Sequence, residues 1–144
     1  MKRPLLTIAA VIAFAGCSGT RPAHIGPANA DLAPCPSSPN CVSTRATGDQ
    51  HRIEPMSYDG DKAAARDRLL AALRGMKRSK IVVAEEDYIH VEFASGLWRF
   101  VDDAEFRFDG PGKIINFRSE ARRGYYDFGM NRKRLEALRK RLQP

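Results

Sequence analysis

The sequence predicts an α+β domain, an antiparallel sheet of about five strands packed on one face by two helices. Three observations support this fold class. Two segments have apolar residues at helical spacing, several short segments alternate apolar and polar residues, and acidic or glycine-rich turns separate neighbouring strands. The expected order of elements is β-α-β-β-β-β-α.

A short strand and a helix come first. Residues 52–58 can form a strand, which Pro55 confines to a sheet edge or a bulge. Asp59 or Asp61 can then cap a helix over residues 62–76. The apolar residues of this helix share one face: Ala65, Leu69, Leu73 and Met76.

Four strands are expected next. Residues 81–83 and 88–93 alternate on either side of an acidic turn, and residues 97–109 form the longest strand. A glycine-rich turn leads back into a strand over residues 113–119. One face of the longest strand is expected to be apolar, with Trp98, Phe100, Ala104, Phe106 and Phe108.

The last expected element is a helix that follows a loop over residues 120–129. Leu135, Leu138 and Leu142 form its apolar stripe. Packed on the sheet, this helix would complete the domain.

The N-terminus has the layout of a bacterial lipoprotein signal. Lys2 and Arg3 precede a short apolar run, and small residues precede Cys17. This layout predicts a signal peptide over residues 1–16 and a mature chain that begins with a lipidated Cys17. The apolar run is shorter than the roughly 20 residues that cross a bilayer, so a permanent transmembrane helix is not expected. A cleaved ordinary signal with an unmodified cysteine is the alternative.

The cellular location predicted by this signal is the cell envelope. Ser18 after the cysteine favours the outer membrane, facing the periplasm, over the inner membrane. Residues 17–33 contain several glycines and prolines and are expected to be a flexible tether. A single domain is expected over residues 34–144, since about 110 residues suit one hydrophobic core.

The charge of the chain limits its partners. The 144 residues carry a formal net charge of +7, which falls to about +5 without Lys2 and Arg3. A basic protein of the envelope meets no genomic nucleic acid, and no nucleic-acid motif is present. Anionic lipids, other envelope components and envelope proteins are the expected partners, in addition to the membrane reached through Cys17.

The two remaining cysteines, Cys35 and Cys41, predict a disulfide in an oxidising compartment. Their spacing does not match a Cys-x-x-Cys redox motif, and the histidines do not complete a zinc site. Neither a metal nor a cofactor is therefore expected.

Carboxylates on the longest strand are the first candidates for a functional site. Asp102 lies on the apolar face, where a carboxylate must be paired, protonated or beside a cavity. Asp103 and Glu105 share the opposite face, and an acid–base pair is one interpretation of them. The preferred interpretation is an ion-pair network with basic residues that flank or follow them: Arg99, Arg107, Arg118, Arg122 and Arg123.

The start of the last helix is the second candidate. Asp127 can cap this helix, and the amide of Asn131 is expected to face the sheet and satisfy buried backbone or Asp102. The cations in the first turns oppose the helix dipole, so an anionic partner is expected. That partner is either the nearby acidic cluster or an anion bound by backbone N–H groups with Arg122, Arg123 and Arg132.

A third set of polar residues lies on one strand. Tyr88, His90 and Glu92 share a face, and a half-exposed polar face explains them better than a catalytic trio. No nucleophile triad, phosphate loop or metal signature is present, so no catalytic residue is assigned.

Three motifs stand out in the chain: Cys35-Pro-Ser-Ser-Pro-Asn-Cys41, Phe100-Val-Asp-Asp-Ala-Glu-Phe106 and the run from Arg118 to Arg134. Together they resemble one family of bacterial and plastid proteins, the domain of unknown function 1499. The similarity covers about residues 32–142, keeps the order and spacing of the motifs, and implies the domain boundaries but no activity. The chain departs from the family pattern at Glu120, Ala121 and Tyr126, so a serine usual in the family is absent.

The sequence as a whole predicts a membrane-anchored envelope lipoprotein that binds an anionic lipid or another envelope component without catalysis. An envelope hydrolase that uses Asp103 and Glu105 near the loop of residues 118–132 is one alternative. A module that docks another protein is the other.

Overall fold

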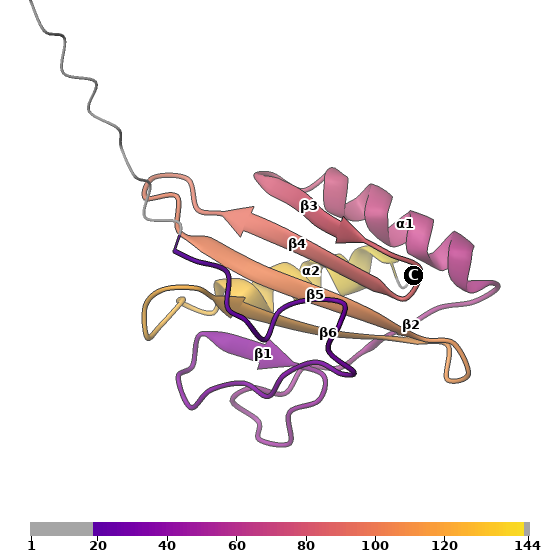
Figure 1. Ribbon diagram of the computed structural model, residues 1–144, viewed down its shortest axis with the longest axis horizontal. Helices are drawn as coiled ribbons and strands as arrows, with labels where there is room; N and C mark the ends of the chain where they lie inside the picture. Colours follow the sequence, from indigo (N-terminus) through magenta and orange to yellow (C-terminus); the bar gives the residue numbers. More distant parts are fainter. Residues whose placement is uncertain (1–18, 143–144) are drawn as a thin grey trace, which may run out of the picture.

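The computed structural model describes residues 19–142 (Figure 1). Cys17 and the expected signal of residues 1–16 lie outside the described residues. No helix within the described range combines the length and apolar character needed to cross a membrane. The elements are β1 (Cys41–Ser43), β2 (Met56–Ser57), α1 (Lys62–Arg74), β3 (Ser79–Ala84), β4 (Tyr88–Ala94), β5 (Val101–Asp109), β6 (Ile114–Ala121) and α2 (Met130–Leu142).

The strands form one antiparallel sheet in the order β1-β6-β5-β4-β3, and β2 pairs with β6 beside β1. The predicted α+β class, with two helices and an antiparallel sheet, is confirmed. β1 has no counterpart among the elements that the sequence predicts, because three residues are too few to show alternation. The predicted strand over residues 52–58 is reduced to β2.

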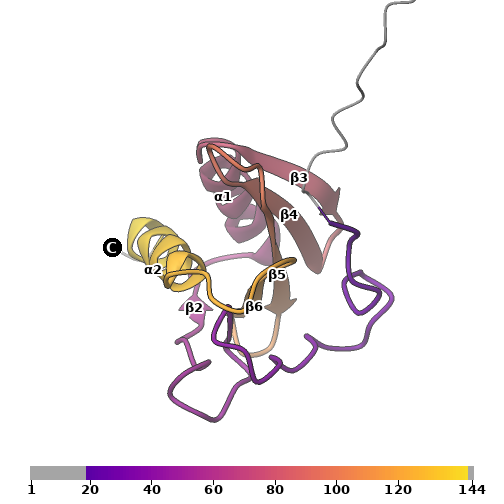
Figure 2. The same ribbon diagram turned by 90° about the vertical axis from the view of Figure 1, so that its left-hand side faces the viewer.

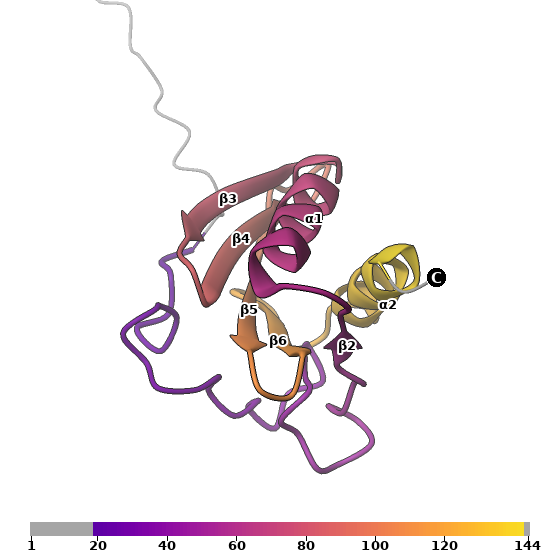
Figure 3. The same cartoon turned by 90° about the vertical axis from the view of Figure 1, so that its right-hand side faces the viewer.

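The helices cover one face of the sheet, and the chain that begins at residue 19 runs along the other (Figures 2 and 3). Along β5 the even-numbered residues face the helices, and Phe106 pairs with Phe117 of β6. Leu69 and Leu73 of α1 and Leu135 of α2 pack against them in one core. These leucines are fully buried, which confirms the predicted apolar stripes at their positions, whereas Met76 follows the end of α1 and is only partly buried.

The start of α1 follows the prediction. The side chain of Asp61 accepts a hydrogen bond from the backbone N–H of Ala64 at 2.8 Å. This bond satisfies one of the four N–H groups that lack a partner within a helix. Gly75 ends the helix and donates to the carbonyl of Ala71.

β5 begins at Val101, later than the sequence predicts. Arg99 adopts a left-handed backbone with a φ of 52°, and the backbone N–H of Ser95 donates to the carbonyl of Phe100. Because of these two features, the residues between β4 and β5 form a loop and do not extend β5. Trp98 and Phe100 are 67% and 41% exposed, so their predicted place on the core face is wrong.

The segment before the disulfide lies on the polar face of the sheet. Ile25 and Leu32 are buried, and Arg107 donates to the carbonyl of Gly26 at 3.2 Å. The described part of the expected tether is thus packed on the domain. Two buried apolar side chains and the hydrogen bonds from Arg107 contact the sheet here, which the average composition of the segment does not reveal.

The predicted disulfide between Cys35 and Cys41 is present. It leads directly into β1, where Val42 is buried in the core. The bridge therefore joins residues 19–34, which we name the covering segment, to the edge of the sheet.

Candidate functional site

A cluster of charged residues is buried on the polar face of the sheet. Every second side chain of β4, β5 and β6 points to this face, and the register pairs Glu105 with both His90 and Arg118. Residues 19–34 cover the cluster on the side away from the helices (Figure 2). Its most buried members are Tyr88, His90, Asp103, Glu105 and Arg118.

Asp103 is bound to two side chains of this cluster. Its Oδ1 lies 2.7 Å from Nε2 of His90, and Arg122 donates to its two oxygens at 2.6 and 2.7 Å. Burial penalises the carboxylate, but the hydrogen bonds from His90 and Arg122 outweigh this penalty and lower the pKa of Asp103. Arg122 also donates to Glu92 at 2.5 Å. Its hydrogen bond to Asp103 raises the pKa of Arg122, so both partners are charged.

Glu105 has a different partner. The hydroxyl of Tyr88 donates to its Oε1 at 2.7 Å, and burial together with this bond raises the pKa of Tyr88. Among the described residues, Oε2 of Glu105 and Nδ1 of His90 have no hydrogen-bond partner. Buried polar atoms without a partner are costly, so these two atoms are poorly satisfied in the cluster.

Asp103 and Glu105 therefore differ from an open pair of catalytic carboxylates. Both are almost fully buried, at 1% and 2% exposure. The ion-pair interpretation describes Asp103, which is bound to Arg122. A catalytic acid–base pair would need access to substrate, which this packing does not give.

The polar residues of β4 are buried, so the predicted half-exposed face is wrong at Tyr88 and His90. The segment before the disulfide covers them. Ligand atoms of His90, Glu92 and Asp103 lie within 4.8 Å of one another, a spacing compatible with a metal ion. The guanidinium of Arg122 already contacts both carboxylates, and its positive charge would repel a cation there.

A second polar cluster joins the start of α2 to the sheet. Asp127 accepts hydrogen bonds from the backbone N–H groups of Gly129 at 2.9 Å and Asn131 at 2.8 Å. Asn131 is fully buried, accepts from Ser119 at 2.5 Å and donates to the carbonyl of Asn40 at 3.3 Å. The structure thus places Asp127 at the predicted helix cap and Asn131 against buried backbone.

Asp102 lies on the helix-facing side of β5, as its position in the strand requires. Arg134 donates to its Oδ2 at 2.8 Å and to Asn131 at 2.9 Å. The guanidinium of Arg134 also stacks 4.5 Å from the centre of the Phe93 ring. Burial raises the pKa of Asp102 and outweighs the opposite effect of Arg134.

Beside Asp102 lies a cavity of about 450 Å³, which we name the end cavity. It lies between the β4–β5 loop and the loop that leads into α2. Its apolar lining is Phe93, Phe100, Tyr126, Phe128 and Met130, and its basic lining is Lys77, Arg78, Arg123 and Arg134. The two carboxylates in the lining, Asp102 and Asp127, are engaged by Arg134 and by the helix N–H groups.

Of the basic residues that the sequence proposes for an anion, only Arg123 lines the end cavity. Arg122 is held by Asp103, and Arg118 donates to Glu120 at 2.5 Å. Arg132 donates to the carbonyl of Arg52 at 2.7 Å. The expected anion site formed by Arg122, Arg123 and Arg132 is therefore not assembled, because Arg122 and Arg132 bind different partners and only Arg123 lines the end cavity.

The sequence missed several residues of the end cavity. Tyr125 and Tyr126 stand between Gly124 and Gly129 in the sequence. Aromatic residues in a segment bounded by glycines could have predicted an exposed aromatic loop. The contribution of the α1–β3 turn has no such signal. Its Lys77 and Arg78 reach the cavity only because the strands bring distant turns to one end of the sheet.

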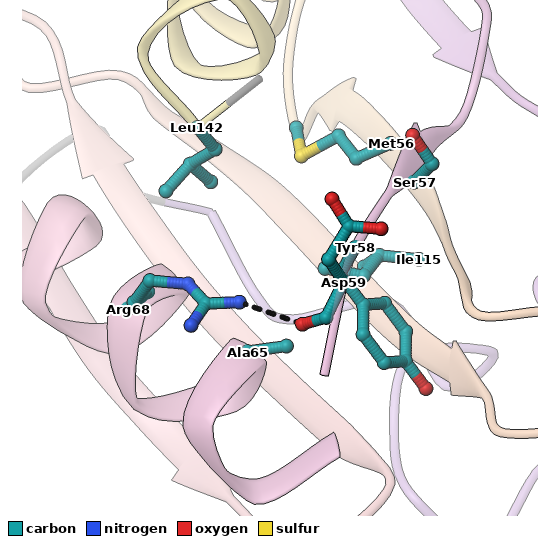
Figure 4. Close-up of a pocket in the computed structure, with 8 residues that line it drawn as sticks. All are labelled: Met56, Ser57, Tyr58, Asp59, Ala65, Arg68, Ile115 and Leu142. Atoms are coloured by element: carbon teal, nitrogen blue, oxygen red, sulfur yellow. Dashed lines mark hydrogen bonds between the residues drawn. The ribbon is translucent and has the colours of Figure 1, made fainter. Parts of the chain in front are cut away.

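Another cavity, of about 510 Å³, lies between α1, β2 and the end of α2 (Figure 4). Arg68 donates to the carbonyl of Asp59 at 3.3 Å across one side of it. Its lining contains one carboxylate, Asp59, one guanidinium, Arg68, and one aromatic ring, Tyr58. The end cavity is the stronger candidate for a ligand.

Comparison with known proteins agrees with the motifs. The sequence profile of a family described as "Protein of unknown function (DUF1499)" matches residues 31–142. No curated protein and no solved structure matches the chain significantly. The matched range takes in β1 to α2, with both polar clusters and all the residues that line the end cavity. The chain therefore belongs to the DUF1499 family.

Proposed function

We propose that this protein is a lipid-anchored component of the bacterial cell envelope whose domain binds an anionic amphiphile in the end cavity. The observation that carries the proposal is the lining of that cavity, in which aromatic and aliphatic side chains stand beside several cations. Cavities of about 300–1,000 Å³ suit small ligands, and this one is about 450 Å³.

The apolar and basic sides of the lining fit the two parts of an amphiphile. Phe93, Phe100 and Met130 offer apolar contact to an acyl chain. Lys77 and Arg123 form no ion pair with a described residue, so their charges are available to a phosphate or carboxylate head group. Asp102 does not cancel them, since Arg134 already pairs with it.

The proposed location rests on the sequence. The signal layout before Cys17 supports lipidation and an outer-membrane address that faces the periplasm. The disulfide between Cys35 and Cys41 supports an oxidising compartment. The hydrolase alternative has little support, because Asp103 and Glu105 are buried and line no part of the end cavity.

Native mass spectrometry of the mature chain tests the proposal. Phosphatidylglycerol added to the protein should form a one-to-one adduct, and Lys77→Ala with Arg123→Ala should weaken it about tenfold or more, because charge-assisted contacts are lost. The matched control, Lys113→Ala with Lys140→Ala, removes two exposed cations that do not line the cavity. This control should bind as the wild type does.

Equal weakening by both double variants would show that only net charge matters and would contradict a specific cavity. A wild-type protein that forms no adduct would also contradict the proposal and would favour a module that docks a protein.

A further inference from the structure

The large apolar side chains exposed on the described surface are confined to two loops and to the first residue of α2. Leu97, Trp98 and Phe100 belong to the β4–β5 loop, Met130 begins α2, and the others belong to the loop before α2. We name these side chains the aromatic end: Leu97, Trp98, Phe100, Tyr125, Tyr126, Phe128 and Met130. Such concentration differs from the scattered single apolar residues of ordinary surfaces and marks an interaction surface.

The two loops are neighbours in space. Phe100 comes from one loop and Phe128 from the other, and both line the end cavity. Tyr126 and Phe128 contact each other edge to face, with ring centres 5.1 Å apart. Leu97, Trp98 and Tyr125 are not in the cavity lining and are 81%, 67% and 72% exposed, so they form an outer surface beside it.

Both loops hold a non-glycine residue in the left-handed region. Arg99 has a φ of 52° and Phe128 a φ of 56°. Bulky residues adopt this conformation rarely and at a cost. At Phe128 it accompanies a side chain that is 76% exposed, so burial within the domain does not compensate the cost.

Positive charge surrounds the aromatic end. Arg99 lies between Trp98 and Phe100, and Lys77 and Arg123 line the adjoining cavity. Among the described residues, none of these three forms an ion pair with a carboxylate. Amphipathic aromatic rings beside cations are typical of side chains that lie at the head-group level of an anionic bilayer.

The described chain begins at the same end of the sheet (Figure 1). A Cβ placed on Gly19 would lie 3.3 Å from Nε of Arg123, so this glycine is next to the loop before α2. Cys17 precedes Gly19 by two residues, and two residues of chain span at most about 7 Å. The predicted acyl anchor is therefore attached close to the aromatic end.

We propose that the aromatic end docks on the bilayer that holds the anchor, with Leu97, Trp98 and Tyr125 in its interfacial layer and the nearby cations against anionic head groups. The inference rests on the anchor proposed above and not on the occupancy of the end cavity. A domain docked in this way would lie on the membrane with a fixed orientation and present the opposite end of the sheet, with the β5–β6 turn, to the periplasm.

Trp98 is the single tryptophan of the chain and reports directly on this docking. The mature lipidated protein would be reconstituted in vesicles of phosphatidylethanolamine and phosphatidylglycerol, with or without phospholipid brominated near the head-group end of its acyl chains. We expect Trp98 emission to shift to the blue and to fall about twofold or more with the brominated lipid, as for a ring in the interface.

Two variants complete the experiment. Leu97→Ser with Tyr125→Ser should restore most of the Trp98 emission without changing the anchor or the cavity lining. Trp98→Phe with Pro111→Trp moves the probe to the exposed β5–β6 turn, where bromine should not quench it.

Equal quenching at positions 98 and 111, or none at position 98, would overturn the docking proposal. A blue shift without bromine quenching would also overturn it, since it would indicate a second copy or a protein partner on this surface. Loss of the phosphatidylglycerol adduct in mass spectrometry, with Trp98 still quenched, would count against the proposed cavity ligand alone.

Discussion

Asp103 and Arg122 form a two-bonded ion pair on a face of the sheet that the chain itself covers. Arg122 donates to the two carboxylate oxygens at 2.6 and 2.7 Å, and the side chains are 1% and 6% exposed. His90 and Glu92 extend the pair on either side. The pair links the end of β6 to β5 beneath the segment that precedes the disulfide, and four predictions follow from it and its surroundings.

Asp103→Asn should lower the free energy of unfolding by about 3–5 kcal/mol, because it leaves the buried charge of Arg122 without its main partner. Urea denaturation followed by circular dichroism measures the change. Asp67→Asn is the control, since Asp67 is 76% exposed and lies 3.5 Å from Arg66 on α1. Its effect should stay within about 0.5 kcal/mol. Similar losses for the two variants would contradict the structural role of Asp103.

Acid should destabilise the wild type partly through Asp103. Its pKa in the folded protein is lower than the ordinary value of 3.8. The stability that it contributes is therefore complete above pH 3.8 and is lost as the pH falls through the folded-state pKa. Thermal unfolding across this acidic range should show a steeper decline for the wild type than for Asp103→Asn. Parallel curves for the two proteins would rule out this contribution.

Asp102 should behave in the opposite way, because burial raises its pKa above 3.8. Its charged form is penalised in the folded protein at neutral pH, and protonation as the pH falls relieves this penalty. Asp102→Asn keeps an oxygen that can accept from Arg134, so we expect a change within about 1 kcal/mol at pH 7. Asp102→Ala removes the acceptor and should cost more. If urea denaturation at pH 7 ranks the two variants in the reverse order, the pairing with Arg134 is not what stabilises this site.

Arg107 should hold the covering segment on the sheet. It donates to the carbonyls of Gly26, Pro27 and Asn29, and its guanidinium lies 4.7 Å from the centre of the Tyr88 ring. Arg107→Ala should therefore increase amide hydrogen exchange in residues 24–29 while β4 and β6 stay protected.

Arg45→Ala is the matched control for Arg107→Ala, since Arg45 contacts the same segment through an exposed pair with Asp31. It should change exchange only near residue 31. Unchanged exchange in the Arg107 variant would mean that the apolar residues Ile25 and Leu32 alone keep the segment in place.

Alternation and helical spacing were sufficient to predict the helices and the main strands. Apolar residues at regular spacing mark the buried face of an element, as Leu69 and Leu73 do for α1 and as Phe106 and Phe108 do for β5. This spacing can be read from the sequence alone. The same reasoning failed at Trp98. Alternation of apolar and polar residues continues through Trp98 in the sequence. However, Arg99 has a left-handed backbone and belongs with Trp98 to the β4–β5 loop, so β5 begins only at Val101.

The candidate site could be predicted only in part. The sequence identified Asp102, Asp127 and Asn131 because a carboxylate on an apolar face, a helix cap and an inward amide each break a local pattern. It could not identify which arginine pairs with which carboxylate. Lys77 and Arg78 stand more than 40 residues before Arg123 in the chain, and nothing in their own segment indicates a shared cavity.

The sequence by itself determined the fold class, the disulfide and the family, since each is encoded in residues close together in the chain, while the anchor at Cys17 stays a prediction. Only the tertiary structure decided that His90, Asp103 and Arg122 are buried together and that the aromatic loops gather beside Gly19. Both outcomes depend on strand register and on a segment folding back over the sheet. Such contacts between distant residues depend on the packing of the whole domain, so the spacing of residues within one segment does not predict them.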